Sequence, residues 1–200
     1  MPSSSSRSPF STPKAELAAG TLGMRLFLAS LAVLFGSSII GYVSIRVLGI
    51  DDTLQMPPLP GGLWLSTVLL LVSSITMQHA VVAVRRGRIT AMRAELAATT
   101  VLAVAFLAVQ AVCWAAWAAP MRDAIGQTEQ RFMLTAFYVL TGLHALHVIG
   151  GLVPLIIINS RAAAGRYSIE RHAGIAYTAM YWHFLDGMWL VIFVTLLIGT

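Results

Sequence analysis

Five long apolar stretches, separated by short polar connections, dominate the hydrophobic pattern of the chain. Each is about 20 residues or longer, the length that an α-helix needs to cross roughly 30 Å of hydrocarbon. Because lipid offers no hydrogen-bond partner to a bare N–H or C=O group, such segments must be helical. The expected spans are about Leu26–Ile45, Gly61–Val84, Glu95–Ala119, Phe132–Asn159 and Ala173–Ile198.

Proline, glycine and serine mark the expected boundaries. A Pro- and Gly-rich segment at residues 57–62 predicts the turn before the second helix. We expect Pro120 to end the third helix, and Pro154 to kink the fourth. Residues 1–23 are rich in Ser and Pro, which predicts a disordered tail. Residues 24–200 then form one five-helix membrane domain, so the fold class is an all-α transmembrane bundle.

Composition supports this interpretation and excludes several functions. The chain is 58% hydrophobic and 10% charged, with a mean hydropathy of +0.80, whereas soluble domains carry roughly a quarter charged residues. Cys113 is the one cysteine, which excludes a disulfide within the chain and a thiolate metal cluster. The sequence contains no metal-ligand motif, nucleophile elbow or phosphate loop, and we expect no catalytic centre in it.

The basic residues predict the orientation, because Lys and Arg accumulate on the cytoplasmic side of membrane proteins. Of the 13 Lys and Arg residues, ten fall in the tail, the second-to-third connection and the fourth-to-fifth connection. The ten are Arg7, Lys14, Arg25, Arg85, Arg86, Arg88, Arg93, Arg161, Arg166 and Arg171. Only Arg46, Arg122 and Arg131 fall on the other side, which predicts a cytoplasmic N-terminus and an external C-terminus.

Polar side chains inside two spans are the candidates for chemistry, since polar groups in lipid are costly. His144 and His147 are spaced i, i+3 on the fourth helix, as are His183 and Asp186 on the fifth. The three histidines fall at similar depth. A facing pair could ligate a haem iron, as in membrane cytochromes of the b type. Alternatively, they hydrogen-bond to neighbouring helices, to Asp186 or to a lipid headgroup, and the spacing leaves both interpretations open.

Other residues have structural interpretations beside functional ones. Ser73 and Ser74 are small and hydroxylated, which favours close helix approach and bonds across the interface. Trp182 is typical of helix packing. Arg85 and Arg86 could hold anionic lipid heads, although their topological role alone would explain them.

Several motifs resemble the cytochrome c oxidase subunit III family, the haem-copper oxidase subunit III. Residues 137–151 (FYVLTGLHALHVIGG) resemble its signature stretch, and residues 181–186 (YWHFLD), followed by Trp189, are similar to its last helix. Further matches are the Leu-rich double-Ser segment around Ser73 and Ser74, the segment 27–46, and Gln110. The resemblance covers about Leu26 to Ile198.

The resemblance implies a bundle like the last five helices of the longer seven-helix form. It implies a non-catalytic subunit with no haem or metal of its own, packed against subunit I, which holds the haems and copper, and in contact with other oxidase subunits. It also implies a bound phospholipid and a bacterial cytoplasmic membrane. The expected lipid or subunit contacts are His144, His147, Tyr181, Trp182, His183, Asp186, Ser73, Ser74, Arg85 and Arg86.

The chain departs from the family at three positions. Leu31, Cys113 and Ala176 stand where relatives usually or often carry a Glu, so a proton-related role of those sites cannot be carried over. The alternatives are an accessory protein of a nitric oxide reductase, a haem-binding b-type membrane cytochrome, or an assembly factor. The motifs leave open whether electrons come from cytochrome c or quinol.

Overall fold

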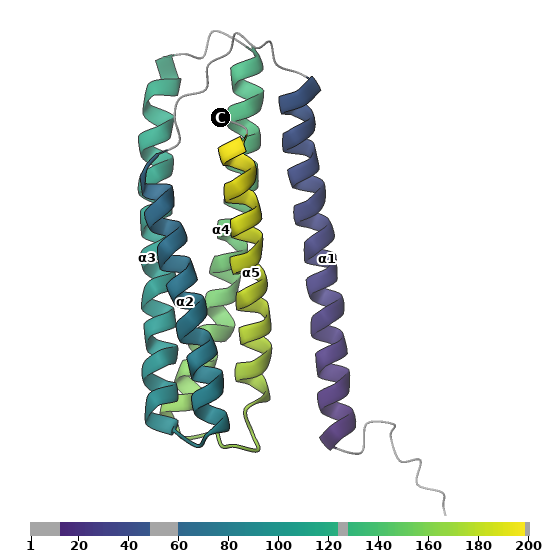
Figure 1. Cartoon of the computed structure of the whole chain (residues 1–200), viewed down its shortest axis with the longest axis vertical. Helices are drawn as coiled ribbons and strands as arrows, with labels where there is room; N and C mark the ends of the chain where they lie inside the picture. The colour runs from purple at the N-terminus through teal and green to yellow at the C-terminus, as the bar shows by residue number, and fades with distance from the viewer. Residues whose placement is uncertain (1–12, 49–59, 124–127, 199–200) are drawn as a thin grey trace, which may run out of the picture.

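The computed structural model describes residues 13–48, 60–123 and 128–198. These residues form five long helices (Figure 1). They are α1 (Pro13–Leu48), α2 (Gly62–Arg85), α3 (Ile89–Asp123), α4 (Thr128–Ala163) and α5 (Ala173–Ile198). All five are long and apolar enough to cross a membrane, which confirms the five expected spans.

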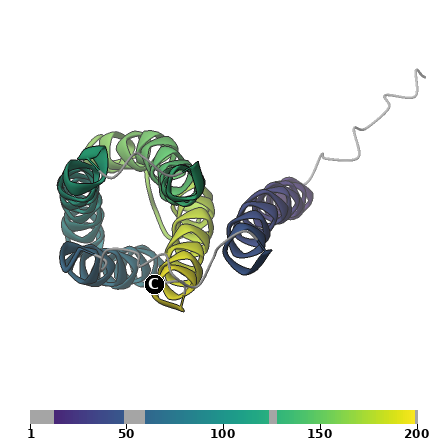
Figure 2. The same cartoon turned by 90° about the horizontal axis from the view of Figure 1, so that it is seen from above.

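Four helices enclose the core and the fifth lies outside them. Seen from above, α2, α3, α4 and α5 follow one another around a ring, and α1 lies beside it (Figure 2). Each ring helix packs on its two neighbours, whereas α1, among the described helices, packs only on α4 and α5. α1 is accordingly the least buried of the five candidate spans.

Several helices extend beyond the apolar stretches that predict them. α1 begins at Pro13, inside the segment expected as a disordered tail, and residues 1–12 lie outside the described part. Proline suits a first helical position because its missing N–H has no partner there. Pro120 does not end α3, which continues to Asp123. Proline lacks the N–H that would bond to the carbonyl four residues earlier, but this removes a single intrahelical bond, and the helix continues for three further residues.

Glycines end α2 and α4 at the same end of the bundle. Gly87 and Gly165 both have φ of +70°, a left-handed conformation that favours glycine. The Gly87 N–H donates to the Val84 carbonyl at 3.0 Å, and the Gly165 N–H donates to the Ala162 carbonyl at 3.0 Å. These bonds satisfy carbonyls that each helix end would otherwise leave unpaired.

The core is built from stripes at helical spacing. On α2, Leu63, Leu70, Met77 and Val84 are all buried and recur every seven residues. The outer faces are also apolar, with Val33 73% exposed and Ile40 67% exposed. A surface this apolar on a long helix fits a lipid environment.

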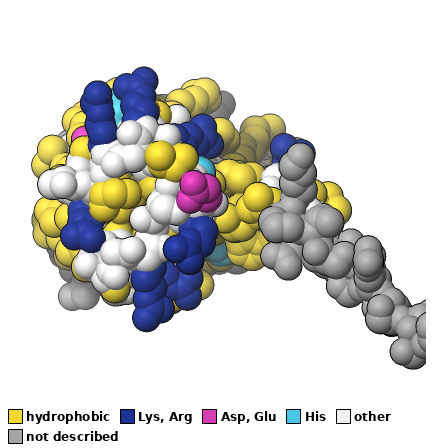
Figure 3. Space-filling model, turned by 90° about the horizontal axis from the view of Figure 1, so that it is seen from below, with side chains coloured by type: hydrophobic (Ala, Val, Ile, Leu, Met, Phe, Trp, Pro, Cys, Tyr) yellow, Lys and Arg dark blue, Asp and Glu magenta, His cyan; other side chains and the backbone are white. Residues whose placement is uncertain are grey.

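Basic side chains gather at one end of the bundle, where the α2–α3 and α4–α5 connections lie (Figure 3). We call this the basic end. Its exposed arginines are Arg85, Arg86, Arg88, Arg93, Arg161, Arg166 and Arg171.

Candidate functional site

Polar side chains join α2 to α5 along their length. The Trp182 Nε1–H donates to the Ser73 hydroxyl at 3.0 Å, and the Trp189 Nε1–H donates to the Thr67 hydroxyl at 3.0 Å. The Ser74 hydroxyl is hydrogen-bonded to His183 Nδ1 at 2.7 Å. The double-Ser segment therefore bonds across a helix interface, as its composition predicts.

His144 lies in the centre of the ring and is 0% exposed. Its imidazole is surrounded by aromatic rings from three other helices: Phe35, Phe106 and Trp189, with ring centroids 6.2, 5.9 and 5.1 Å away. Neither ring nitrogen has a hydrogen-bond partner among the described residues. Since it is enclosed by its own chain, His144 cannot touch lipid or another subunit directly.

His147 faces α1 instead. Its ring centroid lies 5.1 Å from that of Phe35, and its Nδ1 is 2.7 Å from the Leu143 carbonyl one turn earlier. The Tyr181 hydroxyl donates to the His147 carbonyl at 2.9 Å. Tyr181 therefore bonds α5 to α4 through the backbone of this histidine.

His183 and Asp186 lie on the α2 side of α5. Asp186 Oδ2 is 4.0 Å from His183 Nδ1, and the carboxyl group is buried. Neither carboxylate oxygen has a well-formed hydrogen bond within the described ranges, although Ser74 interacts with the group. The Ser74 hydroxyl thus lies between His183 and Asp186.

The three histidines have different surroundings. His144 is enclosed by aromatic rings, and both nitrogens of His183 have protein neighbours, Ser74 and Gln78. No group of three His, Cys, Asp or Glu side chains gathers as a metal site in residues 13–48, 60–123 and 128–198.

Arg85 and Arg86, which are expected to bind anionic lipid headgroups, lie at the α2–α3 turn. Arg86 lines a small pocket of about 210 Å³ that also contains Arg88, His79 and Glu95. His79 Nδ1 lies 3.7 Å from Glu95 Oε1, so an acid is already present in this pocket. Arg85 is exposed at the end of α2 but does not line it.

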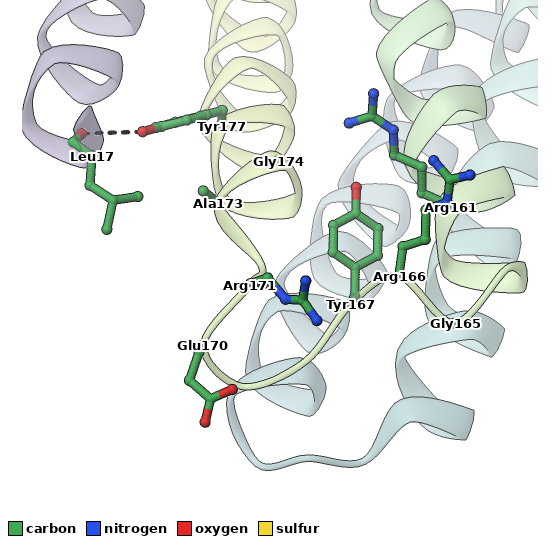
Figure 4. Close-up of a pocket in the computed structure, with 10 residues that line it drawn as sticks. All are labelled: Leu17, Arg161, Gly165, Arg166, Tyr167, Glu170, Arg171, Ala173, Gly174 and Tyr177. Atoms are coloured by element: carbon green, nitrogen blue, oxygen red, sulfur yellow. Dashed lines mark hydrogen bonds between the residues drawn. The ribbon is translucent and has the colours of Figure 1, made fainter. Parts of the chain in front are cut away.

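A larger basic groove lies at the α4–α5 connection, on residues whose sequence pattern predicts only the topology. It has a volume of about 840 Å³, and Arg161, Arg166 and Arg171 line it together with one acid, Glu170 (Figure 4). Tyr167 stands among the three arginines. Burial raises the pKa of Tyr167 above its usual value, with Arg161 opposing, so its hydroxyl stays protonated.

The basic groove continues into an apolar one between α1, α4 and α5. This second groove has a volume of about 590 Å³, and Arg161, Gly174 and Tyr177 line both. Its other lining residues are mostly apolar and include Met24, Phe27, Pro154, Ile157 and Tyr181. Arginines close to a tyrosine in the α4–α5 connection are a feature of the sequence that could have indicated this groove. The residues that α1 contributes carry no such pattern.

Leu31, Cys113 and Ala176, the three positions where a departure from the family is expected, are packed within the bundle in different ways. Leu31 is a buried core residue of α1, and Ala176 is half-buried on α5. Cys113 on α3 is buried against the start of α2, where a Cβ on Gly62 would lie 2.5 Å from its sulfur. The α2–α3 contact here is built around a side chain smaller than Glu.

Comparison with known proteins agrees with this architecture. A family model described as cytochrome c oxidase subunit III matches residues 18–199. The cytochrome c oxidase subunit 3 of Thermostichus vulcanus is 30% identical over 185 residues, which cover 90% of this chain and 87% of that protein.

Two further relatives are longer. The cytochrome c oxidase subunit 3 of Pylaiella littoralis is 33% identical over 138 residues, covering 68% of this chain and 48% of that protein. That of Branchiostoma lanceolatum is 35% identical over 130 residues, covering 65% of this chain and 47% of that protein. The matches thus span about half the length of these two relatives. Because the family match runs from the first candidate span through the last, the chain is a multi-pass membrane protein that belongs to the cytochrome c oxidase subunit III family.

Proposed function

We propose that this chain is the non-catalytic subunit III of a haem-copper terminal oxidase, which stabilises subunit I and holds lipid. The observation that carries the proposal is the family match over residues 18–199. Membership of the cytochrome c oxidase subunit III family implies other oxidase subunits as partners. In this proposal, haem, copper and the reduction of oxygen belong to subunit I, while this chain supplies packing surfaces and a lipid site.

We further propose that the basic end faces the cytoplasm of a bacterial cell. Among the described residues, seven exposed arginines lie at this end, in or near the α2–α3 and α4–α5 connections. Basic connections stay on the cytoplasmic side during insertion. Single-cysteine labelling of a Cys113→Ala background tests the orientation: Ser168→Cys should react with an impermeant maleimide only in inverted vesicles. Labelling from the outside of intact cells would contradict it.

The lipid proposal places an anionic phospholipid in the continuous groove between α1, α4 and α5. Arg161, Arg166 and Arg171 offer charged donors to a phosphate at its basic end. Tyr167 lines the same groove beside these arginines. The apolar continuation past Phe27 and Pro154 fits an acyl chain.

Lipid retention tests this placement. The complex carrying Arg161→Gln and Arg166→Gln should lose most of the anionic phospholipid that co-purifies with the wild-type complex, measured by native mass spectrometry. The matched control is Arg85→Gln with Arg86→Gln, which removes the same charge from the same end, away from the groove. Equal loss in both double variants would contradict a specific site and favour general surface attraction.

Purification of the tagged chain from its own membranes in mild detergent tests the main proposal. We expect a haem-copper subunit I at a fixed ratio, with all haem accounted for by other subunits. A catalytic subunit of a nitric oxide reductase in its place would favour the alternative accessory role. A reduced b-type haem band from a preparation without other subunits would favour the cytochrome, and variable, substoichiometric recovery would favour an assembly factor.

A further inference from the structure

α2 and α5 present a rigid joint face on one side of the ring. They lie side by side at the front of the bundle in Figure 1, and Figure 2 confirms that α1 lies elsewhere. The hydrogen bonds from Trp182 and Trp189 to α2, with the Ser74–His183 bond, fix the two helices in register. A surface built across this interface is therefore pre-formed.

Two polar side chains lie on the outward edge of this interface. His183 Nε2 is hydrogen-bonded to Gln78 Oε1 at 3.2 Å. The His183 side chain is 36% exposed, and Gln78 is exposed. Both lie within candidate membrane spans. The outward position is unusual, because polar groups within membrane spans nearly always face the bundle interior.

Depth makes this exposure costly. Gln78 lies about 10 Å along α2 from its last residue, Arg85, at 1.5 Å per residue. His183 lies about 15 Å along α5 from its first residue, Ala173. Helix lengths of this size place both groups below the headgroups, where acyl chains offer no hydrogen-bond partner.

Gln78 has amide N–H groups without a hydrogen-bond partner among the described residues. Both nitrogens of His183 are engaged, one with Ser74 and one with Gln78. The Gln78 amide uses its oxygen, so its NH₂ group keeps two donor hydrogens that can point outward. A partner at this position must therefore supply an acceptor. The Asp186 carboxyl group lies 4.0 Å from His183, so a hydroxyl or a carbonyl suits the site better than another carboxylate.

A glycine next to this pair leaves room for another helix. Gly187 follows His183 by one turn, is exposed, and a Cβ built on it would meet nothing within 4 Å. The same faces continue as apolar surface at Leu190 on α5 and at Leu71 and Ile75 on α2. Small residues beside a polar group are typical of helix–helix contacts in membranes, where backbones approach closely and hydrogen-bond across the interface.

We propose that the face formed by Gln78, His183 and Gly187 docks a transmembrane helix of another oxidase subunit that carries a hydroxyl or carbonyl acceptor opposite Gln78. The proposal rests on the proposed function, because it takes the partner to be a member of the oxidase complex. It goes further by assigning the contact to the α2–α5 face and by naming the chemistry of the partner. Lipid covering this face is the competing outcome.

Photo-crosslinking in the intact complex tests which molecule covers the face. A benzoylphenylalanine at Ile75 should crosslink to one other oxidase subunit, whereas the same group at Val104, an exposed position on α3, should not crosslink to that subunit. Crosslinking of Ile75 to lipid alone would overturn the proposal. If the unmodified chain purified without any oxidase subunit, the proposed function itself would have failed, so the two failures are distinguishable.

Two substitutions test the named residues. Gln78→Leu removes the amide, and Gly187→Leu fills the space beside it; each should lower the ratio of this chain to the other subunits several-fold after a detergent wash. Gly41→Leu is the matched control, because Gly41 is exposed within α1 and a Cβ there also meets nothing within 4 Å. Retention of both α2–α5 variants at the wild-type ratio would overturn the assignment. The crosslinking result decides the proposal if a variant fails to accumulate.

Discussion

Gly151 on α4 lies so close to Tyr181 on α5 that a Cβ at residue 151 would be 2.8 Å from the tyrosine Cε1. The same Cβ would be 3.2 Å from the Trp182 ring. Both aromatic side chains are buried and hydrogen-bonded to neighbouring helices, Tyr181 to α4 and Trp182 to α2. α4 and α5 can therefore pack this closely because residue 151 is a glycine, which has no side chain.

Gly151→Ala should destabilise the bundle by about 1–3 kcal/mol, the usual cost of forcing a methyl group into a packed core. Thermal unfolding in detergent, followed by circular dichroism, measures the effect. Gly142→Ala is the control, because a Cβ at residue 142 of the same helix meets nothing within 4 Å. If Gly142→Ala lost as much stability as Gly151→Ala, the loss would come from the substitution within α4 itself and not from its contact with α5.

The fold was largely predictable because the membrane constrains it. Apolar length alone predicts the spans, and α5 was expected at its observed bounds, Ala173–Ile198. The early start of α1 and the continuation of α3 past Pro120 were not predicted, since hydropathy reports the hydrocarbon and not the helix end. The ends of membrane helices can reach into the headgroup region. The residues there are polar, so hydropathy does not show that they belong to the helix.

The arrangement of the candidate site was less predictable. Residues three apart on a helix differ by about 60° in direction, since each residue turns the helix by about 100°. That difference is enough to place His144 inside the ring and His147 against α1, although both lie near Phe35. The basic groove escaped prediction for another reason: it brings Leu17 beside Tyr177, and no local pattern connects residues so far apart in the sequence.

The Thr67 hydroxyl has two hydrogen bonds, and we expect the one to Trp189 to contribute to the stability of the bundle. It donates to the Leu63 carbonyl at 2.8 Å and accepts from Trp189 Nε1 at 3.0 Å. Thr67→Val leaves the fully buried indole N–H without this acceptor, which should cost about 1–3 kcal/mol. Thr67→Ser keeps the hydroxyl and should lose much less in the same unfolding measurement. A loss in Thr67→Val no larger than that in Thr67→Ser would contradict a role for the Trp189 hydrogen bond, because only the serine keeps the hydroxyl.

His144 should tolerate an apolar replacement. An imidazole with no partner among the described residues, inside an aromatic cage, contributes packing but no hydrogen bond. We expect His144→Leu to be at least as stable as the wild type, whereas His144→Ala should lose about 2–5 kcal/mol because it leaves a cavity. Detergent unfolding compares the two, and haem content is recorded alongside. A strong loss in His144→Leu would reveal a polar partner of the imidazole.

The attachment of α1 depends on few contacts, and Tyr177 makes one of them. Its hydroxyl donates to the Leu17 carbonyl at 3.1 Å, and Gly20 allows the phenol to approach α1 closely. Tyr177→Phe removes the hydrogen bond and keeps the ring, so amide exchange around residues 17–24 should speed up several-fold while exchange in α3 stays unchanged. Gly20→Leu should have a larger effect, because the added side chain collides with the phenol. Ser37→Ala is the control on α1, since that hydroxyl bonds only to its own helix. Faster exchange throughout the bundle in Tyr177→Phe would show that α1 and the ring unfold together, rather than as a peripheral helix on a stable ring.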